Sequence, residues 1–300
     1  MYKIILMITV LVFSRNSWSC DICGGVNNSG VTGFMPSNLY HFIGIRGNFR
    51  HFESKIHSEL YGSNLSNEYF YQTELFAKYQ FSNRWQGLVT LPYVYNSRII
   101  NGNASSLQGM GDVSLIVMYA PLIETDSNGR VKKQLNLRFG AKVPTGMHAK
   151  NNESITNMYP GTGAFDIPIG LQYTQLFNRS GFYSEITFTY RCPNNFDYAY
   201  GAIGNLSGIY FLNLQHLRLM IKPFIGFSGT AIGKDALNGY IVSSANSGWM
   251  IQSSFGMHLV RNKWLFSFHC QLPIAQNLGD KSVSQKENIS LSITYLLNKN

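Results

Sequence analysis

The chain has 300 residues, of which 13% are charged and 14% aromatic, and its formal net charge is +9 at pH 7. So few charges combined with 18 Tyr, 20 Phe and 28 Gly argue against a soluble helical enzyme and favour a long β-sheet closed on itself. The basic residues form no clustered run and accompany no recognition module, so we expect no nucleic-acid partner.

The first 19 residues have the layout of a secretory signal peptide. Lys3 provides a basic start, an apolar run covers residues 4–13, and the small residues Ser17 and Ser19 follow. The apolar run is shorter than the roughly 20 residues that a membrane-spanning helix needs, and no later segment is longer or more apolar. We therefore predict that residues 1–19 are removed and that the exported chain begins at Cys20.

Residues 20–40 are predicted to form a periplasmic N-terminal segment that carries Cys20 and Cys23 in a C-x-x-C pattern. No His follows this pattern, which excludes c-type haem attachment. A local disulfide suits an oxidising periplasm, two thiolates also suit a soft metal such as copper, and a Cys at a new N-terminus is also a site for lipidation. Of the other cysteines, Cys270 is predicted to point at lipid, so we expect no bridge between Cys192 and Cys270.

Alternation of apolar and polar side chains with a period of two runs along the rest of the chain. In the segment 69–81, Tyr71, Leu75 and Tyr79 point one way, while Glu74 and Lys78 point the other. The segments that share this pattern, two of them weakly, are 41–52, 69–81, 85–95, 113–119, 135–143, 165–173, 182–190, 198–212, 217–225, 249–259, 264–272 and 289–295. Residues 41–300 are thus predicted to form an all-β, closed antiparallel transmembrane β-barrel of about 12 strands in an outer membrane.

A soluble β-sandwich is the alternative, since its strands also alternate. The sandwich is disfavoured because so many bulky aromatic side chains on one face of each strand would give its buried side too much apolar surface.

Long and short connections between these segments alternate. The long ones are expected at 54–67, 97–108, 147–162, 192–197, 231–247 and 274–286, and the stretch 123–132 is longer than a turn. Short turns include Ser82 to Arg84 and Asn178 to Gly181. Bacterial barrels have long external loops and short periplasmic turns, and aromatic residues such as Trp85 and Trp264 near strand ends suit the lipid headgroup boundary.

Charged side chains excluded from lipid must face the lumen. The basic ones predicted there are Arg46, Arg50, Lys78, Arg138, Lys142, Arg191, Arg218 and Lys222, and the acidic ones are Glu68, Glu74, Asp112, Asp166 and Glu185. A barrel of about 12 strands is intermediate between filled and open ones. The excess of basic residues predicts a narrow lumen that favours anions, unless the charges pair across the lumen and close it. The net positive charge also predicts binding of anionic lipopolysaccharide at the rim of the barrel.

An enzymatic role is not expected. The seven His residues are scattered, and the best pair, His258 and His269, is predicted to face inward on neighbouring strands without any recognisable nucleophile motif. We therefore predict hydrogen-bonded lumen side chains at these positions, and neither catalysis nor a cofactor.

Three glycine motifs stand at strand boundaries: GMGD at 109–112, PTG at 144–146 and PGTG at 160–163. In this order and spacing, with their flanking strands, they resemble the outer-membrane barrel family named after meta-pathway phenol degradation, whose members are often called simply transporters. The segment CDICGG at 20–25 also resembles a subgroup of that family, although Gly25 stands where the subgroup has a third Cys, which argues against a role needing three thiols.

The resemblance implies an outer-membrane location and passage of small compounds. The sequence thus predicts a passive channel or transporter for a small solute. The alternative is a non-conducting binding or scaffold barrel whose Cys20 and Cys23 serve a periplasmic partner or a soft metal.

Overall fold

The structure is a computed structural model that describes residues 40–58, 62–150, 157–217, 219–243 and 247–298. The predicted signal peptide, Cys20, Cys23 and Arg218 lie outside these residues. The described part consists of β-strands and their connections, with one 3₁₀ turn at Gly279–Lys281.

Twelve antiparallel strands among the described residues close into one barrel, as the alternation predicts. These strands are β1 (Tyr40–Ser58), β2 (Gly62–Gln80), β3 (Trp85–Ile100), β5 (Val113–Thr125), β6 (Val131–Val143), β7 (Asp166–Leu176), β8 (Ser180–Arg191), β10 (Ile203–Leu212), β12 (Leu219–Ile232), β15 (Gly248–Arg261), β16 (Trp264–Leu278) and β17 (Val283–Asn298). Each pairs with its neighbours in chain order, and β1 pairs with β17 to close the ring. Closure leaves no long sheet edge without hydrogen-bond partners.

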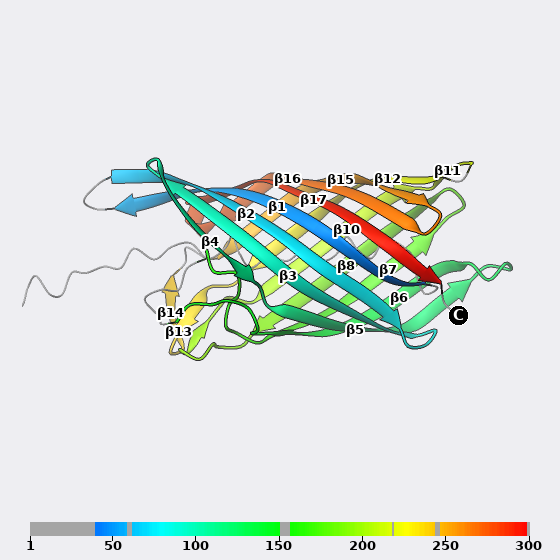
Figure 1. Ribbon diagram of the computed structural model, residues 1–300, viewed down its shortest axis with the longest axis horizontal. Helices are drawn as coiled ribbons and strands as arrows, with labels where there is room; N and C mark the ends of the chain where they lie inside the picture. The colour runs from blue at the N-terminus through cyan, green and yellow to red at the C-terminus, as the bar shows by residue number, and fades with distance from the viewer. Residues whose placement is uncertain (1–39, 59–61, 151–156, 218, 244–246, 299–300) are drawn as a thin grey trace, which may run out of the picture.

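The two ends of the barrel differ (Figure 1). One end, called here the loop end, carries the connection between β1 and β2 and every second connection after it; the other is called the turn end. At the loop end, β4 (Asn103–Met110) pairs with the outer half of β3, and β9 (Tyr198–Ala199), β13 (Asp235–Leu237) and β14 (Tyr240–Ser243) form a separate small sheet. At the turn end, the one additional strand among the described residues is the short β11 (Leu214–His216).

The strands extend further toward the loop end than predicted. Residues 54–67, 97–108 and 274–286 were expected to be loops, but β1 and β2, β3 and β4, and β16 and β17 continue as paired strands through most of these ranges. The predicted strand at 217–225 begins later, because Leu217 has φ of 52° and belongs to a turn. Beyond the apolar part of the barrel both faces of a strand tolerate polar side chains, so alternation no longer marks the strand.

The outer face of the barrel is apolar, as predicted. Strand positions such as Ile45, Leu75, Leu91, Phe139, Ile186 and Ile225 are each at least 40% exposed. Aromatic pairs lie near the turn end: the ring centroids of Trp85 and Tyr119 are 4.7 Å apart, and those of Trp264 and Tyr295 are 4.9 Å apart. Such rings suit a boundary between hydrocarbon and headgroups.

Cys270 occupies an outward position in the alternation of β16, as predicted, but its side chain is only 8% exposed. Both Cys192 and Cys270 are free thiols in the structure.

The lumen is not polar throughout, which the sequence reading missed. Toward the turn end, apolar side chains form two inward clusters: Phe42, Phe76, Leu88, Ile116, Met118 and Leu296 in the first, and Tyr183, Ile209, Phe211 and Phe224 in the second. Toward the loop end lies a third cluster, which contains Phe52, Phe70, Ile203, Ile232, Met250, Leu278 and Val283. Each such side chain contributes about 1.5–3 kcal/mol when it is removed from water.

Glycines on neighbouring strands make room for the inward rings. A Cβ atom on Gly44 would lie 2.5 Å from Cζ of Phe76, and one on Gly181 would lie 2.3 Å from Cζ of Phe211. Part of the high glycine content is therefore explained by aromatic packing across the strands inside the barrel.

Candidate functional site in the lumen

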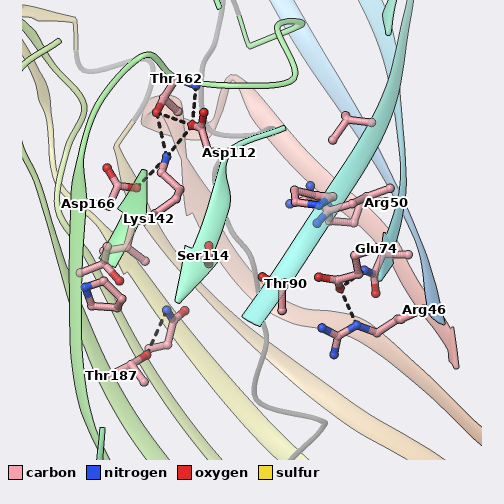
Figure 2. A pocket seen from close by; sticks show the side chains of 18 of the residues that line it. Arg46, Arg50, Glu74, Thr90, Asp112, Ser114, Lys142, Thr162, Asp166 and Thr187 are labelled. Atoms are coloured by element: carbon pink, nitrogen blue, oxygen red, sulfur yellow. Dashed lines mark hydrogen bonds and ion pairs between the residues drawn. The ribbon is translucent and has the colours of Figure 1, made fainter. Parts of the chain in front are cut away.

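A cavity of about 170 Å³ lies inside the barrel, and side chains of β1, β2, β3, β5 to β8, β10, β16 and β17 line it (Figure 2). Along β1 the lining residues Arg46, Asn48 and Arg50 fall between Phe42 of the turn-end cluster and Phe52 of the loop-end cluster. The same order holds on β2. The cavity is therefore a polar layer between two apolar layers.

Most of the predicted inward charges that the structure describes border this cavity. Those among its lining residues are Arg46, Arg50, Glu74, Asp112, Arg138, Lys142, Asp166 and Arg191. Glu185, Lys78, Lys222 and Glu68 are buried but are not among them. Lys78 donates to Gln86 Oε1 at 3.2 Å and its Nζ lies 4.9 Å from the Phe42 ring centroid, so it belongs to the turn-end cluster.

The charges are largely matched by ion pairs. Arg46 Nε lies 2.5 Å from Glu74 Oε1, which also accepts from Asn48 at 3.0 Å. Arg138 pairs with Glu185. Buried charges are stable only when they are paired and hydrogen-bonded, so these pairs explain how the lumen holds them. The lining is thus less basic than a count of Arg and Lys suggests.

Lys142 lies between two carboxylates (Figure 2). Its Nζ is 2.8 Å from Asp166 Oδ2, 3.2 Å from Asp112 Oδ2 and 2.7 Å from the Thr162 hydroxyl. Arg191 Nε is 3.8 Å from Asp166 Oδ2. Asp112, just before β5, thus joins charged residues of β6, β7 and β8 in one connected network on this side of the cavity.

Asp112 joins the three glycine motifs. Its Oδ1 accepts from the Gly146 backbone N–H at 3.0 Å, and its Oδ2 accepts from the Thr162 N–H at 2.9 Å and the Thr162 hydroxyl at 3.0 Å. A Cβ atom on Gly146 would lie 2.6 Å from the Gly111 carbonyl carbon, and one on Gly161 would lie 2.7 Å from Asp112 Oδ1. The glycines are thus needed for close packing around one carboxylate.

The connection between β6 and β7 folds onto the inner wall at its described residues. Asn157 and Met158 are both 4% exposed. Asn157 Nδ2 donates to Glu68 Oε2 at 2.9 Å, Arg98 donates to Asn157 Oδ1, and Asn96 Nδ2 donates to the Met158 carbonyl at 2.9 Å. This connection therefore narrows the lumen.

Sequence reasoning did not assign Tyr159 or Thr162 to the lumen, yet both line the cavity. Thr162 belongs to the PGTG motif, so this motif was the feature of the sequence that could have pointed to a role for Thr162. Its inward position could not be deduced, because it depends on contacts with β5 and with residues about 50 positions away in sequence.

The predicted histidine pair lies inside the barrel. His258 is 3% and His269 is 4% exposed, and their ring centroids are 5.2 Å and 5.4 Å from that of Phe224. His258 Nδ1 lies 2.7 Å from the Ser267 hydroxyl. His258 is hydrogen-bonded as predicted. His269 lines the cavity, and its Nε2 has no hydrogen-bond partner among the described residues.

Within the described part of the chain, no group of three or more His, Cys, Asp or Glu side chains is arranged to hold a metal ion. A search of the same residues finds no helix long and apolar enough to cross a membrane.

Comparison with solved structures identifies barrels with the same fold. An outer membrane channel from Pseudomonas putida F1 superposes with a TM-score of 0.67 and 11% sequence identity, covering 91% of this chain and 100% of that one. The β domain of the Bordetella autotransporter BrkA gives a TM-score of 0.53 and 11% identity, covering 86% of this chain and 100% of that one. The shared feature is the fold.

No protein-family model matches the sequence, and no curated protein matches it significantly. The resemblance of the glycine motifs and of the CDICGG segment to the phenol-degradation family therefore stays a prediction.

Proposed function

We propose that the chain is an outer-membrane β-barrel that passes a small solute through its lumen. The apolar outer face and the aromatic pairs near the turn end support insertion in lipid. In hydrocarbon every backbone polar group needs a partner within the protein, and a closed barrel provides one. The structural likeness to an outer membrane channel agrees with this proposal.

We propose that the loop end faces the outside of the cell. Bacterial barrels place their longer connections outside the cell and their short turns in the periplasm. With twelve strands, β1 begins and β17 ends at the turn end, which is the periplasmic side in this proposal. That side suits the predicted periplasmic role of residues 20–40.

The observation that carries the proposal is the polar cavity between two apolar layers. A chamber lined from ten strands gives a small solute hydrogen-bond partners in the middle of the barrel. The apolar clusters and the inward connection narrow the lumen on either side of the chamber, and this limits the size of a solute that passes. We therefore expect slow, size-limited passage.

Osmotic swelling of liposomes that contain the purified protein tests passage directly. Arabinose is expected to enter faster than raffinose, and the same lipid without protein is the control. Equal, protein-independent rates for both sugars would count against passage of a solute.

A non-conducting binding or scaffold barrel is the second candidate. It is favoured by the apolar layers and by the ion pairs of Arg46 with Glu74 and Arg138 with Glu185, which together fill much of the lumen. Cys20 and Cys23 would then serve a periplasmic partner or a soft metal. Replacing both with Ser and measuring copper bound per protein, beside the unaltered chain, tests this role.

Lipopolysaccharide is the proposed contact of the loop end. Exposed basic residues there include Lys55, Lys234 and Lys281. Their charge suits the phosphate groups of that lipid. Replacing Lys234 and Lys281 with Gln should lower the amount of lipopolysaccharide that copurifies, whereas Lys132→Gln at the turn end should not.

A further inference from the structure

We propose that the luminal cavity selects small hydroxylated organic acids: molecules with one carboxylate and several hydroxyl groups. This rests on the proposed function and adds a substrate class to it. The inference comes from the charge and chemistry of the residues that line the cavity, which lie at mid-barrel, and from the apolar layers that enclose them.

Positive charge exceeds negative charge on the cavity wall. Among its described lining residues, five are Arg or Lys and three are Asp or Glu. Including Glu185, which pairs with Arg138 beside the cavity, still leaves one positive charge in excess. A single anionic group on the solute would balance this excess, whereas a cation would increase it.

The three acidic side chains on the wall already have cationic partners. Glu74 accepts from Arg46, and Lys142 contacts both Asp112 and Asp166. Their negative charge is therefore compensated locally and offers little attraction to a cationic solute. Arg50, across the cavity from Lys142 in Figure 2, is 6% exposed and stacks over Phe70, its Cζ 5.8 Å from the ring centroid.

The remaining polar lining consists of hydroxyl and amide groups. Thr90, Ser114 and Thr187 contribute hydroxyl groups to the cavity wall, and Asn205, Gln271 and Asn288 contribute amide groups. Each group can both donate and accept hydrogen bonds, or holds a donor and an acceptor side by side. Solute hydroxyls can exchange hydrogen bonds with such groups, whereas an apolar solute cannot.

The apolar layers strengthen the selection by charge. They lie on either side of the cavity, and charges interact more strongly beside apolar walls of low dielectric constant. A small excess of charge can then raise the local concentration of an oppositely charged solute.

Three probes with the same six-carbon skeleton test the proposal: gluconate, glucose and glucosamine. Uptake of each labelled compound is measured in liposomes that contain the exported chain. Gluconate is expected to enter fastest and glucosamine slowest, with a ratio on the order of tenfold at low salt that falls as salt screens the charges. Equal uptake of the three, or faster uptake of glucosamine, would overturn the proposal.

Arg50→Gln should reduce the ratio of gluconate to glucosamine uptake, while Arg50→Lys should keep most of it. Arg84→Gln is the matched control, because Arg84 is exposed in the turn before β3 at the turn end and its replacement removes the same charge. A ratio that falls equally in Arg50→Gln and Arg84→Gln would refute a role for the cavity charge. If Arg50→Gln does not fold, the three-probe comparison on the unaltered chain still decides.

Equilibrium dialysis of labelled gluconate against the detergent-solubilised protein separates this inference from the proposed function. Saturable binding that Arg50→Gln weakens, without any uptake, would support the cavity as a binding site and contradict passage. Uptake of all three probes at one rate, with no gluconate bound, would support passage and overturn the selection.

Discussion

The carboxylate of Asp112 accepts hydrogen bonds from both the backbone N–H and the hydroxyl of Thr162, a residue 50 positions further along the chain. The same carboxylate also accepts a hydrogen bond from the Gly146 backbone N–H, with 3.0 Å between the nitrogen and Oδ1. One side chain thus fixes both ends of the described connection between β6 and β7. The three glycine motifs act together because they meet at this point.

Replacing Asp112 with Ala should loosen this connection. The Gly146 and Thr162 N–H groups would lose their acceptor, and Lys142 would lose one of its two carboxylates. We expect larger and noisier single-channel conductance in planar bilayers. Glu124→Gln, an exposed acid near the turn end, is the control. Unchanged conductance with a folded barrel would show that the connection does not restrict the lumen.

Gly146→Ala should destabilise the barrel by about 1–3 kcal/mol, because the new methyl group would overlap the backbone of Gly111 and Asp112. Gly47→Ala is the matched control, since a Cβ atom there meets nothing within 4 Å. Urea unfolding in lipid vesicles measures the free energy of unfolding for both variants. Equal effects of the two substitutions would contradict the close packing around Asp112.

Glu68→Ala should cost about 3–5 kcal/mol of stability, because Arg98 would remain buried without its carboxylate. Glu68 also accepts from Asn157 and Ser54, so the connection would lose a second attachment. In a double-mutant cycle with Arg98→Met, the pair of substitutions should cost much less than the sum of the single ones. Additive costs would mean that the two charges do not stabilise each other.

Phe76→Ala should open the turn-end apolar cluster. Phe76 is 2% exposed, contacts Phe42 edge to face with centroids 5.9 Å apart, and lies under Arg46. The variant is expected to lose about 3–5 kcal/mol of stability and to gain permeability to raffinose in the swelling assay. Phe227→Ala, on the outer face, is the control for permeability. If permeability stays constant while stability falls, the cluster supports the wall but does not limit passage.

Protein isolated from outer membranes should begin at Cys20. Intact-mass spectrometry measures the N-terminus, and a mass lower by two hydrogens than that of the reduced chain would place a disulfide between Cys20 and Cys23. A mass increased by acyl chains would instead identify lipidation, and a chain that still begins at Met1 would contradict the signal peptide.

The sequence alone determined which face of each strand meets lipid. Alternation with a period of two is a local property, so Ile45, Leu75 and Phe139 could be assigned to the outer face without knowing their neighbours. The number of strands followed from the same pattern. The hydrogen bond of His258 was also foreseeable, because a buried His needs a partner.

The tertiary structure decided what fills the lumen. Phe70 and Phe76 are inward neighbours of charged residues on β2, and their apolar character is invisible to a pattern that equates inward with polar. Their burial depends on side chains contributed by strands far apart in sequence. Alternation likewise cannot indicate that strands continue past 54, 97 and 274 toward the loop end, since polar side chains interrupt the pattern there.

Only the closed barrel brings Asp112, Gly146 and Thr162 together around Lys142. Periodicity fixes the direction of a side chain but not which side chain it meets across the lumen, because that depends on strand register and on the path of the connection. For this reason the charged residues that face the lumen could be predicted from the sequence. Which of them pair, and which chamber they enclose, depended on the three-dimensional arrangement.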